Sequence, residues 1–158
     1  MKTYLSYEEL VERMKSVKLI ATDVDGVLTD DTIYFGPDGL ELKRFHVSDG
    51  FYMALAMRTE LELVVISGRP SEATTTRMND LGVKHVLQAP INKAELIKPT
   101  LEKLGIDYAD IAFIGNEILD FPLLRVAGLK MAVLDAAPQV LDEVDYVTAS
   151  PGGRGALR

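Results

Sequence analysis

The stretch KLIATDVDGVLTDD, residues 18–31, carries the strongest structural signal in the chain. An apolar run over residues 19–21 leads into Asp23 and Asp25, and a glycine follows, as expected for a buried strand that ends in a tight loop. Side chains alternate along an extended backbone, so both carboxylates point to one side, where their charges repel unless a cation or a shared proton relieves them. The pair predicts a divalent-metal site, with an acidic turn at a strand end as the alternative.

Length and composition indicate one compact domain, which we expect to span residues 1–158. The chain has 158 residues, 47% of them hydrophobic, which is enough to bury a core. It has no cysteine, which excludes disulfides, thiolate metal sites and a thiol nucleophile. With 17 basic and 24 acidic residues the net charge is −7, which disfavours nucleic acid and anionic membranes as partners. An anionic substrate would therefore need a local positive site or a metal ion.

The N-terminal segment resembles neither a signal peptide nor a membrane anchor. Residues 1–15 are charged throughout and fit an amphipathic helix that opens with a capping box at Ser6. The sequence contains no apolar run of about 18 residues, the minimum for a membrane span. We therefore expect a soluble, cytoplasmic protein with no membrane partner.

Hydrophobic periodicity and turn residues divide the chain into alternating strands and helices. Strands are expected at residues 19–21, 32–35, 40–47, 61–66, 83–87, 111–114, 129–134 and 146–148. Helices are expected at residues 6–17, 49–59, 70–81, 92–104, 120–127 and 138–144. Asp120 is the predicted N-cap of the fifth helix, and Pro99 is predicted to kink or split the fourth.

This alternation, with near-continuous apolar strands, predicts an α/β fold: a Rossmann-like three-layer α/β/α arrangement around a mainly parallel sheet. The turn at residues 36–39, GPDG, predicts a β-hairpin flap over about residues 32–47, inserted after the first strand. No helix-rich insert is recognisable, so no cap domain is expected. The tail, about residues 150–158, is rich in glycine, and its composition favours a flexible, frayed end.

Polar residues gather where the expected parallel strands end, and ligands of such sheets bind outside those ends. These residues are Asp23, Asp25, Ser67, Gly68, Lys93, Asn116, Glu117 and Asp120. They offer a carboxylate nucleophile, a second carboxylate, backbone N–H groups, an ammonium group and further oxygen ligands. A phosphate ester beside Mg²⁺ suits this set, because Mg²⁺ prefers oxygen ligands. Taken singly, Ser67-Gly68 is more typical of a turn, and Lys93 of a solvated helix lysine.

Four segments in this order, DVDGVLTDD, VVISGR, Lys93 and IGNEILD, resemble the four motifs of the haloacid dehalogenase-like phosphatases. In addition, FHVSDG, the Asn92-Lys93 pair and GGRGALR resemble the capless 3-deoxy-D-manno-octulosonate (KDO) 8-phosphate phosphatases and their nonulosonate 9-phosphate relatives. The resemblance implies a Mg²⁺-dependent phosphomonoesterase for a sugar-acid phosphate. KDO 8-phosphate is the first candidate, and N-acylneuraminate or KDN 9-phosphate is the alternative. The resemblance also implies a homotetramer whose neighbouring hairpins roof each site.

The same resemblance assigns roles to individual residues. Asp23 would be the nucleophile that becomes an aspartyl phosphate. Asp25 would act as general acid and then as general base. Ser67 and the Gly68 N–H would hold phosphate oxygens, while Lys93 would neutralise charge on the transferring group.

The implied metal site departs from the family pattern. Its ligands would be Asp23, the backbone carbonyl of Asp25 and Asn116, where the family usually has an aspartate at the third position. An Asn carbonyl lacks charge, so the Mg²⁺ affinity should fall unless Glu117 reaches inward or a water bridges Asp120. A similar Gly-Asn-Glu occurs in the phosphatase-like appendage of vertebrate sialic-acid cytidylyltransferases, which has lost the first aspartate. Because Asp23 is present here, an active enzyme is favoured over a regulatory or assembly domain.

Three arginines are further candidate binding residues, whereas the two histidines are not. Arg69 and Arg77 would bind a sugar carboxylate through a planar guanidinium fork, or would be surface charges. Arg154, on the tail, matches a residue that approaches the site of a neighbouring subunit in the resembling phosphatases. His46 and His85 lack a metal-ligand companion and are interpreted as structural. A phosphomutase or a broad-specificity phosphatase would use the same chemistry, and no residue identifies the sugar.

Overall fold

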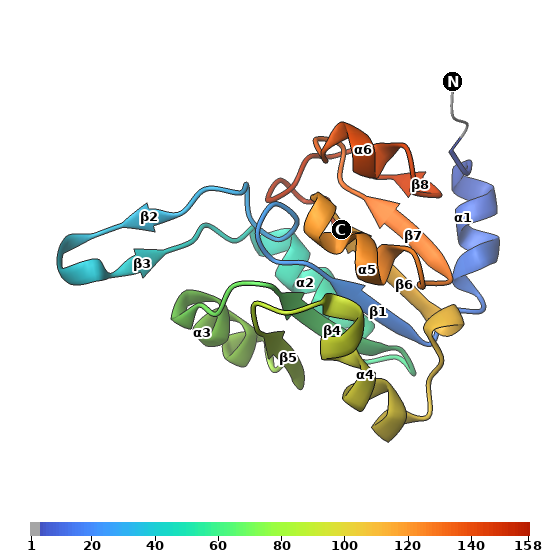
Figure 1. The fold of residues 1–158 in the computed structure, drawn as a ribbon, viewed down its shortest axis with the longest axis horizontal. Coiled ribbons are helices and arrows are strands. Elements are labelled where there is room, and N and C mark those ends of the chain that lie inside the picture. The colour runs from blue at the N-terminus through green and yellow to red at the C-terminus, as the bar shows by residue number, and fades with distance from the viewer. Residues whose placement is uncertain (1–3) are drawn as a thin grey trace.

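The structure is a computed structural model that describes residues 4–158, so residues 1–3 of the predicted domain lie outside it. Its centre is a parallel sheet with the strand order β5-β4-β1-β6-β7-β8 (Figure 1). The strands are β1 (Leu19–Thr22), β4 (Glu62–Ser67), β5 (His85–Gln88), β6 (Ile111–Gly115), β7 (Leu129–Ala132) and β8 (Tyr146–Val147). Because β1 lies between β4 and β6, the three strand ends that carry predicted site residues are adjacent.

Helices cover both faces of the sheet, as Figure 1 shows. They are α1 (Tyr7–Met14), α2 (Val47–Ala56), α3 (Glu72–Leu81), α4 (Lys93–Leu104), α5 (Phe121–Leu124) and α6 (Pro138–Leu141). Neighbouring residues of β4 pack to opposite sides: Val65 clusters with Met53 of α2 and Met78 of α3, whereas Val64 clusters with residues of α4, α5 and α6. This confirms the predicted three-layer fold, whose central strands are buried on both faces. Among residues 4–158, no helix is long and apolar enough to cross a membrane.

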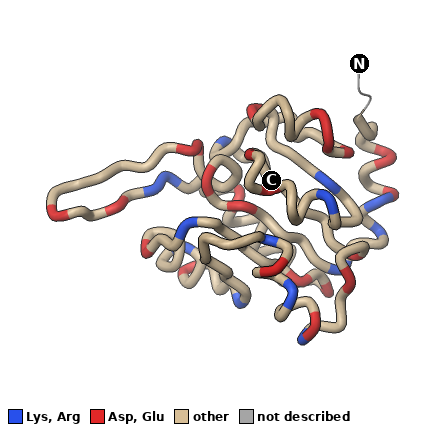
Figure 2. Tube along the Cα trace, in the orientation of Figure 1, with Lys and Arg blue, Asp and Glu red and all other residues tan. Residues whose placement is uncertain are grey.

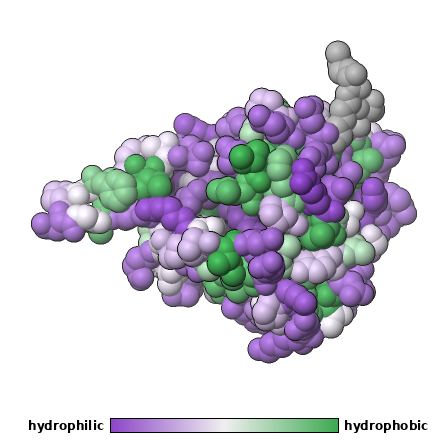
Figure 3. Space-filling model, viewed as in Figure 1, coloured by the Kyte–Doolittle hydropathy of each residue, from purple (hydrophilic) through white to green (hydrophobic). Residues whose placement is uncertain are grey.

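The predicted β-hairpin after β1 is present and projects from the body of the molecule (Figure 1). Its strands, β2 (Tyr34–Phe35) and β3 (Glu41–Leu42), pair antiparallel around a turn at Pro37–Gly39. The strands are shorter than predicted, because the chain leaves the pairing and enters α2 at the end of the second expected strand. Apolar side chains lie on this arm (Figure 3), and Phe35 is 68% exposed. The hairpin is the only insert between β1 and α2 in the described chain, and the fold is capless.

Two local features differ from the sequence prediction. Helix α4 runs unbroken through Pro99, where the sequence predicts a kink or a break. Pro99 and Glu95 are both exposed, so water can satisfy the Glu95 carbonyl that loses its N–H partner. Asp120 directly precedes α5, but its side chain makes no cap hydrogen bond to that helix. Its carboxylate is turned toward the strand ends instead.

The tail is packed, where its composition favours a frayed end. Gly152 and Gly153 are buried, and the Gly153 N–H donates to the carbonyl of Val27 at 2.9 Å. A Cβ atom at Gly152 would lie 1.8 Å from the carbonyl oxygen of Gly26, so only glycine allows this close approach of two backbone segments. The glycines therefore let the tail support the loop that follows β1.

Candidate active site

The carboxyl ends of β1, β4 and β6, with the start of α4, surround a cavity of about 290 Å³. Eight sequence-predicted residues line it: Asp23, Asp25, Ser67, Gly68, Arg69, Lys93, Asn116 and Glu117. They converge because neighbouring strands of a parallel sheet end at the same edge. The structure thus brings residues of four separate motifs to one place.

Lys93 is the buried positive group of the site. The Asn92 side chain caps α4 by accepting the N–H of Ala94 at 2.9 Å, which makes Lys93 the first helical residue. The Lys93 side chain is only 4% exposed, and its Nζ lies 2.7 Å from Asp23 Oδ1 and 2.5 Å from Asp120 Oδ1. Burial alone would lower the pKa of Lys93, but the two carboxylates outweigh burial and raise it. The ammonium group therefore stays charged.

Asp120 fixes the loop after β6. Its carboxylate is fully buried, and Oδ2 accepts the N–H of Asn116 at 2.8 Å and that of Glu117 at 3.1 Å. Oδ1 of the same carboxylate receives Lys93, so Asp120 joins this loop to α4. The structure places Asp120 at the strand ends, as predicted, but the predicted helix cap is wrong, and the contacts with the loop and with Lys93 were not foreseen. The available signal was its place five residues after the end of a buried strand, from which a carboxylate can return to the N–H groups of the loop.

The Asp23 carboxyl group is also buried, and its charge is costly even beside the Lys93 ammonium group. Burial and the neighbouring Asp120 charge raise the pKa of Asp23 to about 7, against the opposing effect of Lys93. A cation bound to Oδ2, the carboxylate oxygen that does not contact Lys93, would favour the ionised form, which is the nucleophilic one. The chemistry of this group therefore fits a metal ion at the site.

Asn116 completes a set of polar atoms that fits Mg²⁺. The amide atom facing the β1 loop lies 3.2 Å from Asp23 Oδ2 and 3.1 Å from the carbonyl oxygen of Asp25. Neighbouring ligands 2.1 Å from an octahedral Mg²⁺ are about 3 Å apart, so an amide oxygen here is suitably spaced from each of the two other oxygens to share one Mg²⁺ with them. Without a cation, the NH₂ group in that place donates to both oxygens. Gly26 makes room, because a Cβ there would lie 1.9 Å from the Asn116 amide.

Glu117 does not compensate for the missing aspartate. Its Oε1 accepts the N–H of Ile118 at 2.7 Å, so the side chain turns back onto its own loop. Within residues 4–158, no three His, Asp or Glu side chains are arranged to hold a metal ion. A metal site built from these groups would be poor in charge: one carboxylate, one backbone carbonyl and one amide, with water to fill the remaining positions.

Comparison with known proteins identifies the family. Residues 84–156 match the family described as haloacid dehalogenase-like hydrolase. The chain is 38% identical over 150 residues to the KDO 8-phosphate phosphatase KdsC of Escherichia coli K12, an alignment that covers 95% of this chain and 80% of the relative. The chain belongs to the KDO 8-phosphate phosphatase family of haloacid dehalogenase-like hydrolases. It is a phosphatase of this type.

Two solved structures of the family share its fold. The KDO 8-phosphate phosphatase of Yersinia pestis superimposes with a TM-score of 0.90 at 35% identity, covering 93% of this chain and 80% of that one. The Moraxella catarrhalis enzyme gives 0.91 at 33% identity, covering 96% and 87%, and was solved with a magnesium ion, a phosphate ion and KDO. The six-stranded parallel sheet with its hairpin is the architecture of these capless phosphatases.

The loop after β4 in this phosphatase presents backbone groups to the cavity. The Ser67 hydroxyl accepts the N–H of Arg69 at 3.0 Å and donates to the carbonyl of the same residue, which shapes a tight turn. A Cβ added at Gly68 would have no neighbour within 4 Å, so open space adjoins this backbone. The open backbone at Gly68 fits a phosphate-oxygen site, to which Ser67 would donate if its hydroxyl proton turned away from the Arg69 carbonyl.

The predicted arginines and histidines of the phosphatase differ in their placement: only Arg69 borders the cavity. Arg69 binds Glu41 Oε2 through Nη2 at 2.5 Å, and its Nη1 has no hydrogen-bond partner within residues 4–158. Arg77 pairs with Asp80 at 2.8 Å, away from the cavity. Arg154 is exposed on the tail and does not line the cavity of its own chain. Neither His46 nor His85 lines it.

Lys43 is a site residue that the sequence analysis missed. It lies just after β3, and its Nζ is 2.7 Å from Asp25 Oδ1, the carboxylate expected to act as general acid. The segment LELKRF gives a weak signal, since Glu41 and Lys43 are two residues apart and so share one side of a strand. Without the fold, nothing indicates that this side faces the β1 loop.

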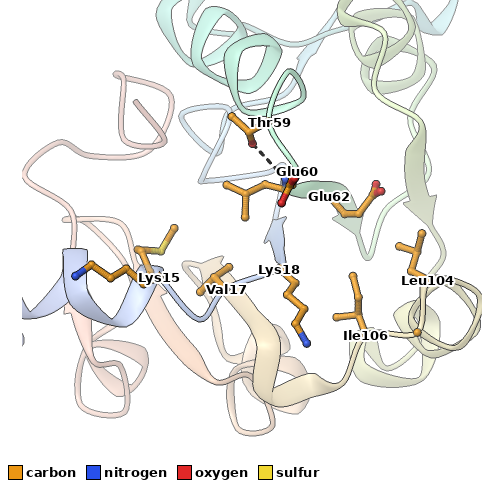
Figure 4. Close-up of a pocket in the computed structure, with 11 residues that line it drawn as sticks. Lys15, Val17, Lys18, Thr59, Glu60, Glu62, Leu104 and Ile106 are labelled. Carbon is orange, nitrogen blue, oxygen red and sulfur yellow. Dashed lines mark hydrogen bonds between the residues drawn. The ribbon is translucent and has the colours of Figure 1, made fainter.

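A larger hollow of about 860 Å³ lies at the amino ends of the strands, near the starts of β1 and β4 (Figure 4). Both of its lysines are paired: Lys15 with Glu12 and Lys18 with Asp110. Parallel sheets bind ligands at the carboxyl ends of strands, and this hollow is at the amino ends. We therefore assign the active site to the smaller cavity.

Proposed function

We propose that this phosphatase hydrolyses KDO 8-phosphate in a Mg²⁺-dependent reaction that passes through an aspartyl phosphate on Asp23. The observation that carries the proposal is the contact of a charged, buried Lys93 with Asp23 at 2.7 Å, beside the oxygens that fit Mg²⁺. The family relationship supports the substrate, because the Moraxella catarrhalis relative was solved with KDO and phosphate.

The proposed reaction has two steps. In the first, an Asp23 oxygen attacks phosphorus, the P–O bond to the sugar breaks, and Asp25 gives its proton to the sugar oxygen. In the second, a water molecule attacks phosphorus while Asp25 accepts its proton, which releases inorganic phosphate and the Asp23 carboxylate. Lys93 and the Ser67–Gly68 turn hold the phosphoryl oxygens in both steps. Mg²⁺, held by Asp23, Asn116 and the Asp25 carbonyl, would supply electrostatic stabilisation of the same oxygens.

The sugar end of the substrate needs groups beyond the phosphate site. Arg69 borders the cavity, and its planar guanidinium group would bind a sugar carboxylate. The cavity has no cap, and the exposed apolar side chains of the hairpin, such as Phe35 and Leu40, suit burial against another subunit. We include in the proposal a homotetramer in which neighbouring hairpins roof each site and Arg154 reaches a neighbouring site.

A phosphate-release screen with Mg²⁺ tests the function. It should include KDO 8-phosphate, N-acetylneuraminate 9-phosphate, KDN 9-phosphate and simple hexose phosphates. The proposal predicts the highest kcat/KM for KDO 8-phosphate, no activity in Asp23→Asn and a loss of ~10²–10⁴-fold in Asp25→Asn. A preference for a nonulosonate 9-phosphate would replace the substrate and keep the mechanism. Failure to hydrolyse any of these esters would indicate a regulatory or assembly domain.

A further inference from the structure

A chain of ion pairs connects the hairpin to Asp25. Figure 2 shows a basic segment directly after β3, at the base of the hairpin, and Lys43 belongs to it. Lys43 Nζ lies 2.7 Å from Asp25 Oδ1 and 3.8 Å from Glu41 Oε1. Glu41 accepts hydrogen bonds from Arg69 Nη2 at 2.5 Å and from Ser71 Oγ at 2.6 Å. The Asp25 carboxylate is thereby linked to the hairpin and to the loop after β4.

The burial of Lys43 points to a role other than stability. Its side chain is 0% exposed, and its remaining polar neighbour is Thr74 Oγ1 of α3 at 3.4 Å. Taking an ammonium group out of water is costly, and a buried ion pair adds little net stability compared with apolar side chains of similar size. A buried lysine fixed against one oxygen of Asp25 does, however, restrict where that carboxylate can point.

Lys43 can act on a substrate only through Asp25. Asp25 lines the cavity and its side chain is 21% exposed, whereas Lys43 does not line the cavity. A phosphate ester in the cavity would therefore meet Asp25 and not the lysine. This arrangement separates Lys43 from Lys93, which lines the cavity and contacts the Asp23 carboxylate directly.

We propose that Lys43 is a positioning residue that orients the Asp25 carboxylate for proton transfer, and that Glu41 holds Lys43 in place. The inference rests on the proposed function, because it concerns the acid and base of that reaction. It makes the hairpin part of the catalytic machinery of its own subunit: a displaced hairpin would carry Lys43 away from Asp25.

The leaving group distinguishes this role from a general loss of structure. A sugar alkoxide needs a proton from Asp25 as it departs, whereas p-nitrophenolate leaves without one. The constant kcat/KM reports the steps up to formation of the phosphoenzyme. A misdirected Asp25 should therefore lower kcat/KM for a sugar phosphate far more than kcat/KM for p-nitrophenyl phosphate.

The experiment compares Lys43→Met, Lys43→Arg and Glu41→Gln with wild type on both substrates. The sugar phosphate is the one that wild type hydrolyses fastest, so a substrate other than KDO 8-phosphate refutes the proposed function and leaves this test intact. For Lys43→Met we expect kcat/KM to fall about 10- to 100-fold with the sugar phosphate and less than threefold with p-nitrophenyl phosphate. Lys43→Arg should retain most of the wild-type kcat/KM for the sugar phosphate. Glu41→Gln should lower the ratio of kcat/KM for the sugar phosphate to kcat/KM for p-nitrophenyl phosphate, as Lys43→Met does.

Arg44→Met is the matched control, because Arg44 is the next residue and pairs with Asp30 instead of Asp25. It should leave the ratio of the two kcat/KM values unchanged. Equal losses of Lys43→Met on both substrates, or a change confined to KM, would overturn the positioning role. If Lys43→Met does not fold by circular dichroism, an unchanged ratio in Glu41→Gln would overturn it.

Discussion

Replacing Asn116 with aspartate should lower the Mg²⁺ concentration that gives half-maximal activity. The substitution keeps an oxygen at the place where the Asn116 amide meets Asp23 Oδ2 and the Asp25 carbonyl, and it adds a negative charge. Mg²⁺ affinity follows the number of charged oxygen ligands, and here that number would rise from one to two. We expect Mg²⁺ to bind about 10- to 100-fold more tightly, or ~1.4–2.8 kcal/mol.

The same substitution should destabilise the protein without metal. Two hydrogen bonds from the Asn116 amide, at 3.2 and 3.1 Å, would be lost, and each contributes ~1 kcal/mol. A second carboxylate would also lie against the buried Asp23. Together these effects should lower the melting temperature in EDTA by about 4–8 °C, since ~2 kcal/mol shifts a domain of this size by that amount.

Two measurements check this prediction: the rate as a function of Mg²⁺ concentration, and thermal unfolding in EDTA and in saturating Mg²⁺. Glu117→Gln is the control, because its amide oxygen can still accept the Ile118 N–H, and both quantities should stay close to wild type. The reasoning is refuted if Asn116→Asp needs as much Mg²⁺ as wild type or more, and melts normally in EDTA. That outcome would remove Asn116 from the metal site.

Three further predictions concern charges. Lys93→Met leaves two buried carboxylates, Asp23 and Asp120, facing each other, so urea denaturation at neutral pH should show a loss of ~3–5 kcal/mol; a loss below ~1 kcal/mol would contradict the ion-pair account. Arg154→Ala removes an exposed side chain, so it should change KM severalfold while the melting temperature stays constant; unchanged kinetics would leave the tail without a functional role. Arg69 and Ser71 hold the pKa of Glu41 at about 2, below its unfolded value of 4.5, so its contribution to stability is present above pH 4.5 and is lost as the pH falls through 2. Glu41→Gln should therefore flatten the loss of stability in this range, and an unchanged acid-unfolding curve would argue against the contact.

The sequence predicts the residues of the site better than their contacts. Asp23, Ser67 and Lys93 could be located because polar residues after apolar strands must meet at one edge of a parallel sheet. Lys43 could not, because a lysine in a hairpin is ordinarily solvated, and its burial depends on the fold bringing residue 43 to residue 25. Asp120 illustrates the same limit. An aspartate directly before a helix can either cap that helix or accept N–H groups of the preceding loop, and the sequence does not distinguish the two.

The remaining differences arise from backbone packing. The glycines of the tail favour a frayed end if only the conformational freedom of the local backbone is considered. In the structure, Gly152 is required by the close approach of the tail to Gly26, which is a contact between distant parts of the chain. At Pro99, by contrast, the local rule that proline breaks a helix is too strict. Pro99 lies on the exposed side of α4, so water can bind the carbonyl group that lacks an N–H partner.

Trapping of the covalent intermediate tests the central claim most directly. The enzyme is mixed with p-nitrophenyl phosphate, quenched within milliseconds and reduced with borohydride, which converts an aspartyl phosphate to homoserine that mass spectrometry can locate. The account predicts homoserine at position 23 in wild type, more of it in Asp25→Asn because the second step lacks its base, and none in Asp23→Asn. Homoserine at another position, or full activity in Asp23→Asn, would contradict it.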